Sequence, residues 1–348
     1  MPPAVVLVTG VSRWLGGALA AELATDPAIE RVIGVDTVPP RGELLGSLGR
    51  TEFVRADIRN PLIAKVIAGA GVDTVVHMNV TATPRGAGGR SSMKEMNVIG
   101  TMQLLAACQK APSMRKLVVK STASVYGSSP KDPALFTEDT EPRRLPSSGF
   151  GKDAVEVEGY VRGFARRRPD VVVTMLRFAN FLGPRIDTPI TRYFGLPAVP
   201  TILGFDPRLQ FLHTMDGLAV LEQATREDHH GTYNVAGGGI VLLSQAIRRA
   251  GRVPVPVPQA AGGALGMMVR RAGVVDFSAE QLSFLTYGRV LDTAKLCRDF
   301  GFTPRYSTVQ AFDDFVRGRN LSSVLGPATI AAAERAVLAA VGRRESND

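Results

Sequence analysis

A glycine-containing segment near the N-terminus constrains the fold of this chain more than any other feature. The residues Thr9-Gly10-Val11-Ser12-Arg13-Trp14-Leu15-Gly16 follow an apolar run at residues 4–8 and lead into a helical pattern at residues 15–25. A buried strand, a glycine turn and a helix N-terminus together present backbone N–H donors and a positive dipole end to an anion. The segment therefore predicts a site for a dinucleotide pyrophosphate, although Arg13 replaces the usual middle glycine. The expected contacts are Gly10, Ser12, Arg13, Trp14, Leu15 and Gly16.

Strand and helix signals alternate through the first half of the chain. Apolar, β-branched runs predict strands at residues 4–8, 32–35, 74–76, 117–119 and 171–175, with a weaker signal at residues 52–54. Helical patterns fall near residues 15–25, 60–69, 91–111 and 149–168. Continuous apolar strands separated by helices indicate a parallel sheet that is covered on both faces. We therefore expect a doubly wound α/β (Rossmann) domain whose ligands lie at the carboxyl ends of the strands.

The sequence changes in character after residue 177. Pro and Gly become frequent, loops are expected up to residue 208, and residues 232–236 resemble one more strand. A helix is expected at residues 243–250, followed by a Pro-rich connector at residues 253–258. We interpret residues 1–176 and 209–240 as the dinucleotide-binding domain and residues 177–208 and 241–320 as a smaller substrate-binding lobe. Residues 321–348 are expected to form an Ala-rich helical tail.

The composition narrows the class of partner. The net charge is +9, but the densest basic run, residues 166–168, ends a predicted helix, where cations complement the helix dipole. No interleaving of aromatic and basic residues points to nucleic acid. Cys108 and Cys297 form neither a metal motif nor a disulfide framework, which favours a reducing cytoplasm. The apolar stretch at residues 260–269 is too short to span a membrane, and we expect no signal peptide.

Acidic residues after the second and third predicted strands bear on the choice of cofactor. Asp36 closes the second strand, at about twenty residues from the last loop glycine, where a carboxylate accepts hydrogen bonds from the adenosine ribose. Because such a carboxylate repels a 2′-phosphate, NAD is favoured over NADP, although Arg41 could soften that preference by folding back. Asp57, followed by Ile58, could accept from the adenine amine or could simply cap the next helix.

Several further segments resemble one known family. They are residues 120–127 (KSTASVYG), 176–184 (LRFANFLGP), 211–216 (FLHTMD) and 301–304 (GFTP). With the N-terminal loop, they make residues 4–315 similar to the extended short-chain dehydrogenases/reductases, the family of NAD-dependent sugar-nucleotide epimerases and dehydratases. Among the activities of this family, the resemblance is closest to UDP-glucose 4-epimerase. It implies NAD as cofactor, a nucleotide-sugar substrate and a homodimer paired through the helices at residues 91–111 and 149–168.

The chemistry of this family requires a Ser or Thr hydroxyl, a Tyr and a Lys four residues after that Tyr. By resemblance, Thr122 takes the first position and Lys152 the lysine position, where it also holds the cofactor, but Ser148 stands where the tyrosine belongs. A serine hydroxyl is a far weaker acid than a phenol and has a shorter reach, so it cannot simply take over proton transfer. Three interpretations stay open: Tyr193 or His213 supplies the proton, a water relayed by Ser148 and Thr122 does so, or the protein binds nucleotide without turnover.

The resemblance assigns roles to other positions as well. Met78, Asn79 and Val80 stand where the family lines the cofactor cleft, and Asn97 stands where an asparagine braces the active-site strand. Substrate contacts are expected from Asn180 and from three arginines, whose guanidinium forks suit a diphosphate. These are Arg185, Arg192 and Arg208.

We therefore expect an NAD-dependent epimerase or dehydratase that acts on a nucleotide sugar and uses no metal ion. In 4-epimerisation the cofactor takes hydride from a sugar carbon, the keto-sugar rotates, and hydride returns to the other face. Two alternatives stay open. One is a dehydrogenase or reductase of a lipid or steroid-like alcohol, since one scaffold hosts several chemistries. The other is a catalytically impaired nucleotide-binding sensor or scaffold.

Overall fold

The computed structural model describes residues 3–82, 89–142, 145–146, 149–259 and 279–321. At its centre lies a seven-stranded sheet in which every neighbouring pair is parallel. From one edge to the other the order is β3 (Glu52–Arg55), β2 (Arg31–Asp36), β1 (Val5–Thr9), β4 (Thr74–His77), β5 (Lys116–Thr122), β6 (Val172–Phe178) and β11 (Gly231–Val235). The chain reverses its direction of travel across the sheet between β1 and β4, which confirms the predicted doubly wound α/β fold.

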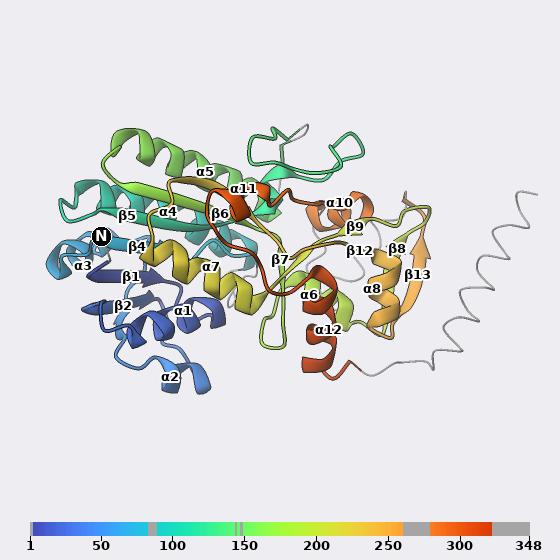
Figure 1. Cartoon of the computed structure of the whole chain (residues 1–348), viewed down its shortest axis with the longest axis horizontal. Helices are drawn as coiled ribbons and strands as arrows, with labels where there is room; N and C mark the ends of the chain where they lie inside the picture. The colour runs from blue at the N-terminus through green and yellow to red at the C-terminus, as the bar shows by residue number, and fades with distance from the viewer. Residues whose placement is uncertain (1–2, 83–88, 143–144, 147–148, 260–278, 322–348) are drawn as a thin grey trace, which may run out of the picture.

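Helices cover both faces of this sheet (Figure 1). One face carries α1 (Trp14–Thr25) and α7 (Thr214–Arg226), with α2 (Glu43–Ser47) beside α1; the other carries α3 (Ile63–Ala70), α4 (Gly89–Lys110) and α5 (Gly149–Arg167). Side chains of a strand alternate between the two faces. In β1, Val6 and Val8 contact the core under α1, whereas Leu7 contacts the core under α3 and α4.

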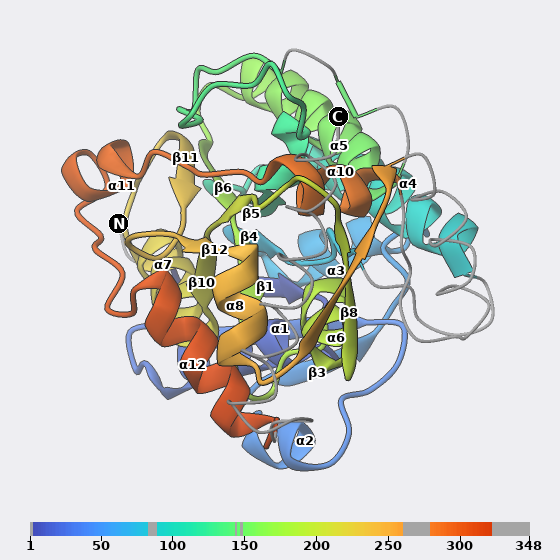
Figure 2. The ribbon, with the colours of Figure 1, turned by 90° about the vertical axis from the view of Figure 1, so that its right-hand side faces the viewer.

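A smaller lobe lies at one end of the sheet and has its own core (Figure 2). Its described part contains two-stranded pairs: β7 (Asn180–Leu182) with β10 (Phe211–His213), β9 (Arg208–Leu209) with β12 (Val241–Leu242), and β8 (Ala198–Ile202) with β13 (Val253–Val257). The helices around them are α6 (Pro189–Gly195), α8 (Leu243–Arg249), α10 (Ala279–Tyr287) and α12 (Thr308–Gly318). A short helix, α11 (Ala294–Arg298), contacts β11 of the large sheet.

Two segments of this lobe differ from the sequence prediction. Residues 177–208, expected as loops, contain β7, α6 and β8, and residues 253–258, expected as a connector, contain β13. Proline lacks the N–H that a strand donates, and it is tolerated where pairing does not need that donor. In β13 the Val253 N–H donates to the Pro197 carbonyl, and the Val257 carbonyl accepts from Leu203 N–H. The valines thus carry these bonds, while Pro254 and Pro256 alternate with them.

Residues 322–348 of the predicted helical tail lie outside the described residues. Among the helices that the structure does describe, none is both long and apolar enough to cross a bilayer.

Candidate functional site

The loop between β1 and α1 has the tight geometry that the glycine spacing predicts. Gly10 has a φ of +76°, and a Cβ at this position would lie 2.5 Å from Asn79 Oδ1. A Cβ at Gly16 would lie 2.4 Å from the Gly10 carbonyl oxygen. Arg13, by contrast, has φ −96° and ψ 149°, an extended conformation that any L-residue adopts. The arginine therefore replaces the usual middle glycine without backbone strain.

This loop forms one wall of a cavity of about 420 Å³ at the carboxyl ends of β4, β5 and β6. Residues 185–189 and Arg192 also line it. The structure brings most of the predicted contacts together here: Gly10, Ser12, Arg13, Trp14, Leu15, Gly16, Met78, Val80, Thr122, Asn180, Arg185 and Arg192. Sequence reasoning missed other lining residues, among them Thr81, Lys120, Phe150 and Asp187. We refer to this cavity as the cofactor cleft.

Asp36 lies at the end of β2, next to the loop. Its side chain is buried, Oδ2 accepts a hydrogen bond from Ser12 N at 3.0 Å, and Oδ1 accepts from Thr37 N at 2.8 Å. Hydrogen bonds from backbone N–H groups fix the orientation of a carboxylate. The position predicted to bind the adenosine ribose therefore holds an oriented carboxylate, although Asp36 does not itself line the cleft.

Asn79 and Asn97 support the cleft from behind. Asn79 is buried against Gly10. Asn97 in α4 is fully buried; its Oδ1 accepts from Thr81 N, and its Nδ2 donates to the Thr81 carbonyl, both at 3.0 Å. Nδ2 also lies 3.3 Å from Asp153 Oδ2 of α5. Asn97 thus fixes the segment that follows β4. Its amide is buried and bonded to Thr81, so Asn97 braces the cleft and does not present a free amide to a cofactor.

Asp57 and Ile58, predicted to contact the adenine, do not line the cleft. Asp57 Oδ2 pairs with Arg59 Nη2 at 2.6 Å, and Oδ1 accepts from Arg59 N at 2.9 Å. The Arg59 guanidinium lowers the pKa of Asp57. Ile58 is buried in the core against Gly100. Asp57 does not cap the next helix either, because α3 begins at Ile63 with Leu62 as its N-cap and no side-chain cap; the carboxylate instead holds the turn at Arg59.

The structure describes two of the three residues assigned to catalysis, and of these Thr122 lines the cleft. Thr122 ends β5, and its Oγ1 accepts from Ser124 N at 3.2 Å, so the threonine caps the 3₁₀ turn Ala123–Tyr126. Lys152, in the first turn of α5, is exposed and is not part of the cavity wall. Ser148 lies outside the described residues.

Lys120 is a cleft residue that the sequence analysis overlooked. It lies in β5, and its Nζ donates a hydrogen bond to the Val80 carbonyl at 2.6 Å. Burial lowers the pKa of Lys120 to about 7, with a smaller contribution from the charge of Arg13. Burial also lowers the pKa of His77 to about 3, and this histidine bridges Thr9 and Thr101 as a neutral ring. The sequence of β5 holds no distinguishing signal for Lys120, because the strand contains a second lysine, Lys116.

The geometry contradicts the two proton donors considered from the second half of the chain. Tyr193 is fully buried in the smaller lobe, where its hydroxyl donates to the Pro200 carbonyl at 2.8 Å. Burial raises its pKa. His213 is 3.1 Å from Asp314, accepts from Met215 N and stacks on Tyr306. Neither side chain lines the cofactor cleft, so neither can serve as its acid.

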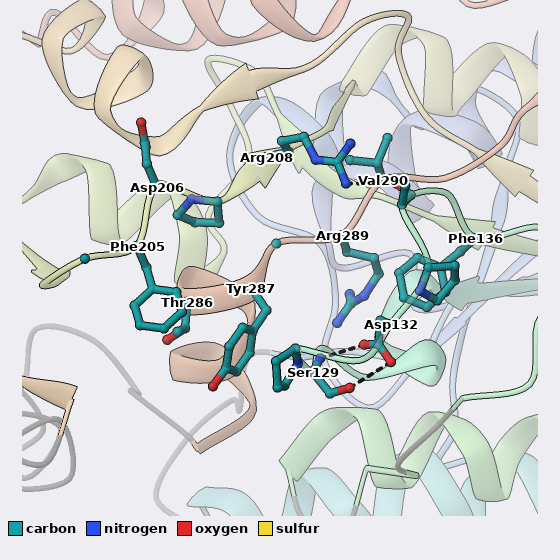
Figure 3. A pocket seen from close by; sticks show the side chains of 16 residues that line it. Ser129, Asp132, Phe136, Phe205, Asp206, Arg208, Thr286, Tyr287, Arg289 and Val290 are labelled. Atoms are coloured by element: carbon teal, nitrogen blue, oxygen red, sulfur yellow. Dashed lines mark hydrogen bonds between the residues drawn. The ribbon is translucent and has the colours of Figure 1, made fainter.

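The predicted substrate arginines are divided between different places. Arg185 is exposed on the wall of the cofactor cleft. Arg192 also lines the cleft, but its Nε donates to Asp187 Oδ1 at 2.8 Å, so part of its charge is already matched. Arg208 lies elsewhere, in a pocket of about 430 Å³ between residues 129–136, residues 204–208 and the end of α10 (Figure 3).

Arg289 reaches into the middle of this second pocket (Figure 3). It is buried, its Nε donates to the Gly127 carbonyl at 2.8 Å, and its Nη2 lies 3.1 Å from Ser128 Oγ. Burial lowers the pKa of Arg289 to about 10. Its contacts fix the chain that follows Thr122 to the end of α10, and the sequence analysis did not single it out.

A doubly wound sheet with a tight glycine loop at its crossover point and a cleft beside that loop defines a Rossmann-type dinucleotide-binding protein. The model of the NAD dependent epimerase/dehydratase family matches residues 6–236, more than half of the chain. The chain belongs to this family.

The chain is similar both to curated proteins and to solved structures. An uncharacterised protein of Mycobacterium tuberculosis is 53% identical over 325 residues, which cover 93% of this chain and 86% of that protein. The structure of UDP-glucose 4-epimerase from Thermotoga maritima with UDP-glucose has a TM-score of 0.70 at 19% identity, and the match covers 91% of this chain and 98% of that chain. That of dTDP-glucose 4,6-dehydratase from Bacillus anthracis in complex with NAD has a TM-score of 0.68 at 19% identity, with 91% and 96% covered. At 19% identity these likenesses establish the fold alone.

Proposed function

We propose that this protein is an NAD-binding enzyme that acts on a nucleotide sugar as an epimerase or dehydratase, with UDP-glucose 4-epimerisation as the first activity to test. One observation carries the proposal: the glycine loop, Thr122 and Asn180 line a single cleft at the carboxyl edge of the sheet. In such folds this edge is where a dinucleotide and its substrate meet. Family membership and the nucleotide-sugar ligand of the solved relative support the same class of substrate.

The residues present fit NAD. Gly10 and Gly16 leave no room for side chains at the turn, so backbone N–H groups at the start of α1 can approach a pyrophosphate. Asp36 presents a carboxylate for the adenosine ribose, which favours NAD over NADP. When bound, NAD supplies the hydride acceptor and donor. The chain itself orients the ligands, and Thr122 Oγ1 is placed to bind a substrate hydroxyl.

Arg185 is the cleft arginine that we propose for the substrate diphosphate, and Asn180 of the same cleft is proposed to contact the substrate as well. Arg185 is exposed on the cleft wall, whereas Arg192 is held by Asp187 and Arg208 lies in the second pocket. We also propose that residues 177–208 and 241–320 act as the substrate-binding lobe, since Asn180, Arg185 and Arg192 all come from it.

A second candidate is a nucleotide sensor that binds NAD without turnover. The exposed position of Lys152, together with the serine at position 148, favours it, because both depart from the family arrangement. Calorimetry with NAD and NADP, combined with NMR detection of UDP-galactose formed from UDP-glucose, separates the two. NAD binding with sugar conversion supports the enzyme. Binding without conversion of any nucleotide sugar supports the sensor, and a chain that binds neither nucleotide contradicts both.

We predict that Asp36→Asn weakens NAD binding by about 10- to 100-fold, because a hydrogen bond to a charged group contributes about 1.5–3 kcal/mol. The variant should also discriminate less against NADP, since the repelling charge is gone. Calorimetry with both nucleotides measures the two affinities. Glu30→Gln, which removes an exposed carboxylate before β2, is the matched control and should leave both unchanged. Equal NAD affinity in Asp36→Asn and the wild type would contradict the role of Asp36.

We also propose a cytoplasmic homodimer paired through α4 and α5. Ile99 and Met102 of α4 and Tyr160 of α5 have exposed fractions of 42%, 41% and 39%, large values for apolar side chains. Replacing both Ile99 and Met102 with lysine should convert a dimer to a monomer in light scattering, because like charges would face each other across the interface. Leu62→Lys, at an apolar site before α3 that is still more exposed (53%), should not. A wild-type monomer at micromolar concentration would overturn this proposal.

A further inference from the structure

The cofactor cleft contains a cationic side chain to which the family's chemistry assigns no role. Lys120 lies in β5 two residues before Thr122, and both line the cleft. Because side chains alternate along a strand, residues two apart project on the same side. Lys120 Nζ donates to the Val80 carbonyl, and among the described residues it forms no ion pair with a carboxylate. The ammonium is thus held in place by a neutral acceptor.

Burial and the charge of Arg13 both disfavour the protonated form of Lys120. Arg13 approaches from the loop before α1, and its charge lowers the pKa of Lys120 in addition to the larger effect of burial. His77 approaches from β4, but its own pKa of about 3 keeps it neutral at physiological pH. With a pKa of about 7, Lys120 is present as both amine and ammonium in neutral solution. A group in this state can accept and return a proton efficiently.

We propose that Lys120 is the proton-transfer group of this cleft, in place of the tyrosine that the family uses. The inference rests on the proposed function. With NAD bound to supply hydride chemistry, the neutral Nζ amine would take the proton of a substrate hydroxyl as that hydroxyl is oxidised. The resulting ammonium would return the same proton when the keto group is reduced. One proton and one hydride leave and return, so no further reactant is needed.

The geometry favours Lys120 over the other groups considered for this step. Lys152 is exposed and outside the cleft wall, while Tyr193 and His213 are fixed in the smaller lobe. Thr122 lies on the same side of β5 as Lys120 and can orient the substrate hydroxyl without titrating. The Val80 carbonyl holds Nζ at the end of β4, where the cleft begins.

The first test measures the titration of Lys120 directly in the wild-type chain, without ligand. Lysines are labelled with a trace amount of acetic anhydride at a series of pH values, and the extent of labelling is read peptide by peptide by mass spectrometry. Lys120 should reach half of its maximal reactivity near pH 7. Lys152 is the internal control, because its side chain is exposed and lies outside the cleft wall. A Lys120 profile that follows that of Lys152 would overturn the inference while leaving the proposed function intact.

The second test compares Lys120→Met and Lys120→Arg with Lys152→Met. Loss of a positioned acid or base lowers a rate by about 10²–10⁴-fold, so both Lys120 variants should slow sugar conversion by this amount. Their NAD affinity should change by less than tenfold, and their fold is checked by circular dichroism. In the wild type the rate should depend on a group of pKa near 7, and this dependence should vanish in Lys120→Arg, whose side chain does not titrate there.

Each outcome of the second test has a definite meaning. Full conversion by Lys120→Met, or an unchanged pH profile in Lys120→Arg, would overturn the role of Lys120. A large loss in Lys152→Met with no loss in the Lys120 variants would return the role to the family lysine. If the wild type binds NAD but converts no nucleotide sugar, the proposed function fails, and the proton-transfer role fails with it, whatever the labelling shows.

Discussion

Replacing Gly16 with alanine should lower the affinity for NAD by more than about 100-fold. A Cβ at this position would lie 2.4 Å from the Gly10 carbonyl oxygen and 2.9 Å from the Gly10 carbonyl carbon, and both are backbone atoms. The turn therefore has to open, which displaces the N–H groups that meet the pyrophosphate at the start of α1. Loss of two charge-assisted hydrogen bonds, each contributing about 1.5–3 kcal/mol, accounts for a change of this size. Calorimetry with NAD measures it.

The stability of the Gly16 variant should fall as well, by about 1–3 kcal/mol, because the extra methyl overfills a packed turn. Gly159→Ala is the matched control. Gly159 is exposed in α5, and a Cβ there meets nothing within 4 Å. Alanine is the better helix former, so this variant should be more stable by about 0.5–1 kcal/mol and bind NAD normally. Normal NAD binding by Gly16→Ala would show that the cofactor does not use this turn.

The central sheet could be predicted from the sequence because its strands are buried on both faces. Each strand then reads as a continuous apolar run, and the runs at residues 4–8, 32–35, 74–76 and 117–119 all fall within or overlap β1, β2, β4 and β5. The smaller lobe lacked this signal. Its strands are short, and β13 alternates valine with proline, a residue that usually ends a strand. Only the partner strand β8 shows that the prolines are compatible with pairing.

The cleft could be predicted in part, for reasons that differ between residues. Loop contacts such as Gly16 follow from local spacing, and the structure places them on the cleft wall. Asp57 could not be assigned from spacing, because its pairing with Arg59 depends on the turn between them. Arg208 and Arg185 look alike in sequence, yet the chain carries them into separate pockets. The position and pKa of Lys120 depend on its burial, on Arg13 and on the Val80 carbonyl, which come from other parts of the chain. The sequence of β5 alone does not show these neighbours.

A buried ion pair between α5 and β6 is expected to control stability. Glu158 of α5 is 2% exposed; its Oε2 lies 2.8 Å from Arg177 Nη2, and its Oε1 accepts from Ser121 Oγ at 2.6 Å. Arg177 Nη1 donates to Tyr126 OH at 2.8 Å, and Tyr126 OH in turn donates to Asn234 Oδ1 at 2.8 Å. This network joins α5, β5, β6 and β11 directly behind Thr122.

Glu158→Gln should therefore lower the free energy of unfolding by about 3–5 kcal/mol, because it leaves the Arg177 guanidinium buried without its counter-charge. Denaturant unfolding followed by circular dichroism measures this value. Glu52→Gln is the matched control, since Glu52 pairs with Arg31 through two similar hydrogen bonds but both side chains are more than 40% exposed. An exposed pair contributes about 0–1 kcal/mol, so the control should lose no more than that.

The double variant Glu158→Gln/Arg177→Met distinguishes the cost of an unpaired charge from the loss of packing. Removing both charges takes away the uncompensated guanidinium, so the double variant should regain part of the stability lost by Glu158→Gln. The coupling energy from the four chains of this cycle should be about 1–3 kcal/mol, in the range measured for groups of one network. If the losses in the two single variants instead add within about 0.5 kcal/mol, the pair is not coupled, and Glu158 stabilises the fold through its other partners, Ser121 and Arg162.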